Sequence, residues 1–177
     1  IDKIYKKLNF NLDHLELSTR PEKRIGSDEI WDKAEKILES ALKKNKMKYK
    51  LNPGDGTFYG PKIDFHVKDS LGRNWQCGTI QLDFAMPERF ELEYTDENNK
   101  IKRPVMVHRA VFGSFERFIG ILIEHLNGDF PLWLSPNQIK VLALTDKNNK
   151  YAEKIFKELE KAGFRVELDI KSETMNK

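Results

Sequence analysis

Cysteine is nearly absent from this sequence, whose 177 residues include one, Cys77. A lone cysteine excludes an internal disulfide framework and is typical of proteins in the reducing cytoplasm. Long apolar runs are absent as well, because the longest, residues 118–123, is far too short to span a bilayer. The N-terminus mixes lysine with apolar residues and shows no signal peptide. We therefore expect a cytoplasmic protein without a membrane segment.

An excess of either charge is also missing: 31 Lys and Arg stand against 28 Asp and Glu, a net charge of +3. This balance argues against a polybasic tail or a protein that coats nucleic acid, but it allows a local nucleotide or RNA site. The chain does not begin with methionine and ends in polar residues. We expect a piece cut at both ends, long enough for one domain or one domain and part of another.

Apolar periodicity predicts most of the elements. Residues 27–45 have the repeat of an amphipathic helix that Ser27 can cap. The Gly- and Pro-rich stretch 52–61 predicts a loop. Four strands joined by short turns are predicted beyond it, over 62–69, 74–84, 89–95 and 101–111. Short turns produce hairpins, so these strands form an antiparallel sheet, which the apolar helix 115–126 closes.

Composition changes at residues 130–136, where two prolines interrupt any helical period. A strand, a helix and a strand are predicted after this point. About 40 residues cannot bury a parallel sheet on both faces, so we expect a domain over 1–134 followed by a truncated α/β domain over 135–177. The predicted fold class is α+β, an antiparallel sheet flanked by helices.

Two expectations concern side chains that share a face. In the helix 115–126, Arg117 would lie with Gly120, Ile121 and Glu124, and the core face would consist of Phe115, Phe118, Leu122 and Leu126. In the strand 74–84, Gly78 is a natural bulge position that would let Gln76 and Thr79 share one face. Asp64 and His66 would face solvent, and we assign them no role.

Arg117 opens the most apolar helix directly after Gly113 and Ser114. Free backbone N–H groups, a positive helix end and a fixed guanidinium together favour a phosphate site. The alternative is a structural ion pair of Arg117 with Glu116 or Glu93. Spacing by itself leaves both interpretations open.

Longer stretches resemble a known family. Residues 108–124, "HRAVFGSFERFIGILIE", are similar to motif 3 of the class II aminoacyl-tRNA synthetases, with Ser114 where the general pattern has glycine. The stretches "LSTRPEKRIGSDEIW", "GDGTFYGPKIDF" and "WQCGTIQLDF" resemble the threonyl branch of that family. "FPLWLSPNQIKVLAL" resembles the junction into its anticodon-binding domain.

The resemblance implies a threonine–tRNA ligase, which activates threonine with ATP and transfers it to the 3′ end of tRNA(Thr). It implies Mg with the ATP, a catalytic zinc ion and a homodimer, with motifs 1 and 2 outside this chain. The isolated chain should be inactive. The alternative is a non-catalytic synthetase-like module that binds RNA or protein.

The resemblance also assigns roles to residues. Arg117 and Lys62 would be catalytic, Arg117 with Gln76 and Thr79 would bind ATP, and Thr79 and Gln81 would lie near the aminoacyl end. Tyr59 and Gln81 would bind threonine, and His108 would be one of three zinc ligands. Zinc would bind the threonine hydroxyl and so reject valine, which an apolar pocket separates poorly. With one ligand present, the chain should not hold zinc tightly.

Overall fold

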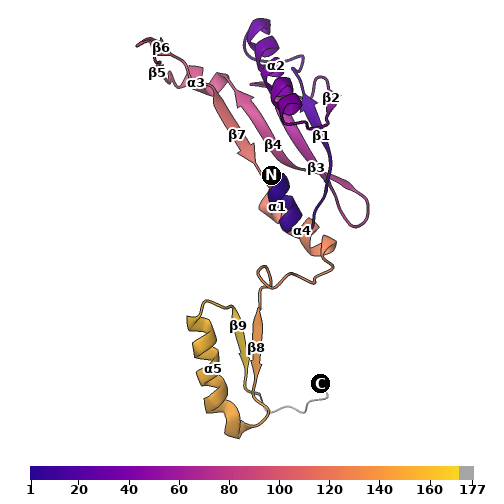
Figure 1. Ribbon diagram of the computed structural model, residues 1–177, viewed down its shortest axis with the longest axis vertical. Helices are drawn as coiled ribbons and strands as arrows, with labels where there is room; N and C mark the ends of the chain where they lie inside the picture. Colours follow the sequence, from indigo (N-terminus) through magenta and orange to yellow (C-terminus); the bar gives the residue numbers. More distant parts are fainter. Residues whose placement is uncertain (172–177) are drawn as a thin grey trace. The chain divides into compact units, whose positions relative to one another are not determined.

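The computed structural model describes residues 1–171, and these divide into two compact units with the boundary between His125 and Leu126. The first unit contains a five-stranded sheet (Figure 1). Its strands, in spatial order, are β2 (Lys50–Asn52), β1 (Leu12–Ser18), β3 (Lys62–Lys68), β4 (Asn74–Asp83) and β7 (Met106–Ala110). β1 and β2 are parallel, and the other neighbours are antiparallel. The α+β class and the hairpin from β3 to β4 are confirmed.

One face of this sheet is apolar and forms the core with helix α2 (Asp28–Lys44). Strands β1 and β3 bury Leu15, Leu17, Ile63, Phe65 and Val67, and α2 buries Trp31, Ala34, Leu38 and Leu42. The Ser27 side chain caps α2 as predicted, and the Trp31 indole donates to the Ile25 carbonyl at 2.8 Å. The helical apolar stripe therefore fixes α2 on the sheet.

Two further helices, α1 (Asp2–Lys7) and α4 (Phe115–His125), lie side by side. Tyr5 stacks on Phe118 and Phe10 packs against both Phe118 and His125. The prediction for α4 is correct in extent but wrong in two side chains. Phe115, in the first turn, is exposed, and Ile121, which was expected on the face of Arg117, is buried with Phe118 and Leu122.

The opposite face of the sheet is polar. Across β3 and β4, Lys62 pairs with Gln81, Asp64 with Thr79 and His66 with Gln76, so all six share this face. The register shifts between Phe65 and His66, which leaves Cys77 as the extra residue beside Gly78. The predicted bulge is confirmed, and it brings Gln76 onto the face of Thr79 and Gln81. The prediction that Asp64 faces solvent is wrong, because this side chain is buried.

Residues 89–95 do not form the predicted strand. The chain instead forms a short helix α3 (Ala85–Arg89), and then a separate hairpin of β5 (Tyr94–Thr95) with β6 (Ile101–Lys102). Asp83 stabilises the start of α3, because its carboxylate accepts from the backbone N–H groups of Ala85 and Met86 at 2.9 and 3.0 Å.

The second unit contains β8 (Ile139–Leu142), a 3₁₀ turn η1 (Asp146–Asn148), helix α5 (Asn149–Lys161) and β9 (Val166–Asp169). The two strands are parallel and α5 packs on them, which confirms the predicted strand, helix and strand. Gly163 follows α5 with φ +91°, the left-handed geometry that ends many helices. Within residues 1–171, no helix is both long and apolar enough to span a bilayer.

Candidate active site on the polar face of the sheet

Three of the predicted site residues meet at the β4–β7 side of the polar face. The Tyr59 hydroxyl donates to Gln81 Oε1 at 2.6 Å, and Gln81 pairs in register with His108. The Tyr59 and His108 rings meet edge to face, 6.0 Å apart. His108 Nε2 lies 2.8 Å from Asp83 Oδ2. A phenol, an amide and an imidazole therefore lie together, and all three are groups that can hydrogen-bond a small polar ligand.

The loop before β3 holds Tyr59 in this position. Gly60 lies so close to β4 that any side chain there would overlap the Leu82 carbonyl oxygen. The Leu82 N–H donates to the Pro61 carbonyl at 3.1 Å, and the Thr57 hydroxyl donates to the Gly60 carbonyl at 2.7 Å. Glycine is therefore required for the close backbone approach that directs Tyr59 at Gln81.

Asp83 was not among the predicted site residues. Burial by itself would raise the pKa of the Asp83 carboxyl, but hydrogen bonds from the Met86 N–H, His108 and the Ala85 N–H outweigh it and lower the pKa. The anionic carboxylate then fixes the orientation of the His108 ring. A sequence signal did exist, since the aspartate side chain commonly accepts hydrogen bonds from backbone N–H groups a few residues ahead and so forms a turn.

Lys62 lies on the same face with its ammonium group between two carboxylates. Its Nζ is 2.6 Å from Asp64 Oδ2 and 2.9 Å from Asp55 Oδ2. Asp64 is 1% exposed and also accepts from the Ser18 hydroxyl and the Gln76 amide. Burial alone would lower the pKa of Lys62, but the bonds to Asp64 and Asp55 raise it. Lys62 is thus a fixed cation, held by a carboxylate that the sequence interpretation left without a role.

Arg117 lies at the start of α4 and contacts β4. Its Nη2 donates to the Gln76 carbonyl at 2.7 Å, and its backbone N–H bonds the Ser114 hydroxyl at 3.3 Å. Glu116 bonds Ser114 rather than Arg117. No ion pair of Arg117 with Glu116 or Glu93 is formed among residues 1–171, so the structural alternative in its original form is wrong. The guanidinium is anchored at one nitrogen and exposed.

Thr79 and Gln76 complete the face. The Thr79 hydroxyl is buried and has no hydrogen-bond partner within the described part of the chain, whereas the Gln76 amide is occupied by Asp64. The predicted residues form one continuous face, with Tyr59, Gln81 and His108 in direct contact and Lys62, Gln76 and Arg117 in neighbouring networks.

Comparison with known proteins identifies the family of both parts of the chain. Residues 1–126 match the family described as "tRNA synthetase class II core domain (G, H, P, S and T)", and residues 138–177 match "Anticodon binding domain". The threonine–tRNA ligases of Desulforamulus reducens and Fusobacterium nucleatum are each 59% identical to the chain over 99% of its length. The chain spans 27% and 28% of those relatives.

A solved structure is similar over nearly the whole chain. It is the RNA-binding domain of threonyl-tRNA synthetase from Cryptosporidium parvum, 48% identical with a TM-score of 0.92. The match covers 98% of this chain and 44% of that one. With its core matched over residues 1–126, the chain belongs to the class II aminoacyl-tRNA synthetases.

Proposed function

We propose that this chain is the part of a threonine–tRNA ligase that completes the activation site and begins the anticodon-binding domain. The observation that carries the proposal is the polar face on which Tyr59, Gln81 and His108 meet beside the Lys62 and Arg117 cations. The proposal is supported by two relatives that are named threonine–tRNA ligase and are each 59% identical to this chain. The two domains would cover 1–134 and 135–177.

In this proposal the chain's residues position the reactants. Tyr59 and Gln81 bind threonine through a phenol and an amide that already contact each other at 2.6 Å. Arg117 directs its exposed guanidinium at ATP beside Gln76 and Thr79, where it stabilises charge that develops as pyrophosphate leaves. Lys62 supplies a second fixed positive charge near the adenylate. Mg would accompany the ATP.

His108 fits the role of a zinc ligand. Asp83 holds one ring nitrogen, as a carboxylate commonly does for a metal-bound histidine, and the other nitrogen is left for a metal. The other protein ligands would come from parts of the relatives that this chain does not cover. A zinc ion there would supply a Lewis acid that binds the threonine hydroxyl, which valine lacks.

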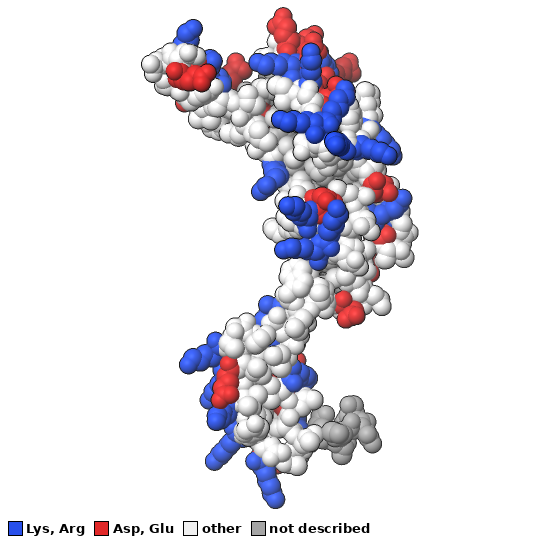
Figure 2. Space-filling view, in the orientation of Figure 1, with Lys and Arg blue, Asp and Glu red and all other residues white. Residues whose placement is uncertain are grey.

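The second unit would take part in tRNA(Thr) binding, given its match to an anticodon-binding domain. Lys and Arg side chains gather over α5 (Figure 2). These include Lys150, Lys154, Lys157 and Lys161, with Glu153 and Glu158 between them. With Glu160 included, α5 has four lysines against three glutamates, and its lysines would supply the contacts to a phosphate backbone. The complete enzyme would be a cytoplasmic homodimer.

A chimera tests the proposal with this chain's own residues. The matching segment of the Fusobacterium nucleatum ligase is replaced by residues 1–177, and threonine-dependent ATP–pyrophosphate exchange and threonylation are measured. We expect both activities in the chimera and no exchange by the isolated chain. Within the chimera, Arg117→Ala should reduce exchange about a hundredfold, roughly 3 kcal/mol in the transition state. Arg117→Lys should recover little, because an ammonium cannot form a planar two-pronged contact.

Thermal unfolding of the same variants separates the site role from a structural one, and the exposed Lys33→Ala on α2 is the control that should change neither. Stability loss without rate loss in Arg117→Ala would contradict the nucleotide role. A folded, dimeric chimera that binds tRNA but never activates threonine would favour the non-catalytic module.

A further inference from the structure

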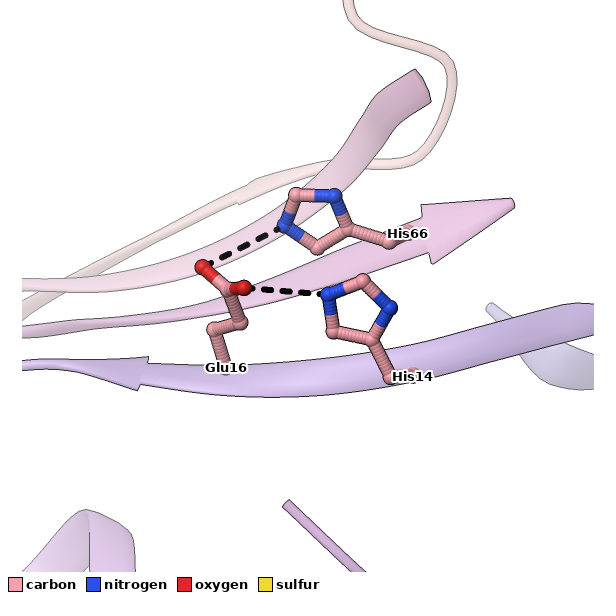
Figure 3. Close-up of side chains that lie close together, drawn as sticks. All are labelled: His14, Glu16 and His66. Atoms are coloured by element: carbon pink, nitrogen blue, oxygen red, sulfur yellow. Dashed lines mark hydrogen bonds and ion pairs between the residues drawn. The ribbon is translucent and has the colours of Figure 1, made fainter. Parts of the chain in front are cut away.

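A second group of metal-ligand side chains lies on the polar face away from His108. His14 and Glu16 are two residues apart on β1, and His66 on β3 pairs with His14 in register. Figure 3 shows both imidazole rings directed at the Glu16 carboxylate. We call these three residues the histidine cluster. Nothing in the proposed ligase reaction uses it.

The cluster has the geometry of a nearly closed cation site. The three candidate ligand atoms lie within 4.8 Å of one another. Glu16 Oε1 is 3.0 Å from His14 Nε2, and Glu16 Oε2 is 3.6 Å from His66 Nε2. The two rings stack 4.4 Å apart at 9°. The side chains are 15%, 21% and 16% exposed for His14, Glu16 and His66, so an ion would be largely shielded but reachable.

Two observations show that the cluster has nitrogen atoms available to a cation. His66 Nε2 is buried and has no hydrogen-bond partner within residues 1–171. His14 Nδ1 lies 2.6 Å from Asp13 Oδ2, and Lys68 holds Asp13 at 3.0 Å. If Nδ1–H donates to Asp13, the Nε2 lone pair faces the Glu16 carboxylate, an arrangement that a cation would stabilise.

We propose that His14, Glu16 and His66 bind a divalent transition-metal ion of the zinc class. Two imidazoles and one carboxylate suit Zn²⁺ and leave a fourth position for water or another oxygen ligand. Tetrahedral bonds of about 2.0–2.1 Å need ligand atoms roughly 3.4 Å apart, so modest rotation of the two rings closes the site. Asn52 donates to Glu16 Oε2 at 2.9 Å and helps to hold the carboxylate.

This site is distinct from the position of His108. In the sheet, His108 pairs with Gln81 on β4, whereas the cluster lies on β1 and β3. Lys62 and Asp64 lie on β3 between His66 and the position that pairs with Gln81. From the sequence we expected no tight zinc binding, because His108 was the one zinc ligand that the resemblance identified in this chain. The structure assigns the chain a ligand set made from residues that are 52 positions apart.

Metal titration of the purified, metal-free chain tests the proposal. Co²⁺ is added as the spectroscopic probe and Zn²⁺ as the competitor, with stoichiometry read from visible absorption and elemental analysis. We expect one bound equivalent, lost in His14→Ala and His66→Ala and retained in His108→Ala and His125→Ala. Asp13→Asn should weaken binding about 10- to 100-fold, because Asp13 orients a ligand.

Thermal unfolding with and without Zn²⁺ completes the test. The ion should raise the melting temperature of the wild type and not that of His66→Gln, which preserves polarity if the alanine variant fails to fold. Absence of a stoichiometric equivalent in the folded wild type would overturn the proposal. So would loss of binding in His108→Ala with full retention in His66→Gln, since the ion would then belong to the other site.

Discussion

The buried contact between Lys62 and Asp64 gives the sharpest stability prediction. Asp64→Ala removes three hydrogen bonds, from Ser18 at 2.9 Å and from Lys62 and Gln76 at 2.6 Å each. It also leaves the Lys62 ammonium, whose side chain is 10% exposed, with one remaining carboxylate. Breaking a buried pair costs about 3–5 kcal/mol. Because Asp55 still contacts Lys62 at 2.9 Å, we expect a loss of about 3 kcal/mol.

Urea unfolding followed by tryptophan fluorescence measures this loss. Trp31 is fully buried in the same unit and reports on its core. With a slope of about 2 kcal/mol per molar urea, a loss of about 3 kcal/mol lowers the midpoint by roughly 1.5 M. Asp55→Ala is the matched control, since Asp55 is 56% exposed and a surface ion pair is worth at most about 1 kcal/mol.

The double variant Lys62→Met with Asp64→Leu completes the cycle. Replacing both charges by apolar groups should recover much of the loss, because no uncompensated buried charge is left. Equal, small shifts for Asp64→Ala and Asp55→Ala would refute the argument that Asp64 is the principal partner of Lys62. A double variant as unstable as Asp64→Ala would show that Lys62 carries no unpaired charge in the single variant.

Two further predictions concern backbone approach and pH. Gly60→Ala should destabilise the first unit by about 1–3 kcal/mol, because the added methyl group overlaps the Leu82 carbonyl oxygen. The same variant should reduce threonine activation in the chimera. An unchanged urea midpoint and an unchanged exchange rate would contradict this prediction. Burial would raise the pKa of Asp69, but hydrogen bonds from the Trp75 indole and from Arg73 outweigh it and lower the pKa in the folded protein. The ionised Asp69 carboxylate therefore stabilises the fold above about pH 4. This contribution is lost as the pH falls from the pKa of the unfolded chain toward the lower pKa of the folded protein. The difference in urea midpoint between wild type and Asp69→Asn should therefore shrink from pH 7 to pH 3, and a constant difference would refute the assignment.

Local patterns in the sequence determined several elements. The helices α2, α4 and α5, the capping Ser27 and the bulge beside Gly78 are confirmed. Each depends on residues within a few positions of one another, so periodicity and turn chemistry suffice. The site residues came from resemblance to a family rather than from periodicity, and their roles stay proposals.

Tertiary structure alone decided the strand order and what lies beneath the polar face. The sequence interpretation did not find β1 or its parallel partner β2, and it predicted one strand over 89–95 where only Tyr94–Thr95 is a strand. Asp64 reads as a surface residue from alternation, yet it is buried because Ser18, Lys62 and Gln76 reach it from three strands. His14 and His66 meet for the same reason. Pairing of distant strands fixes such contacts, and no local pattern records which strands will pair.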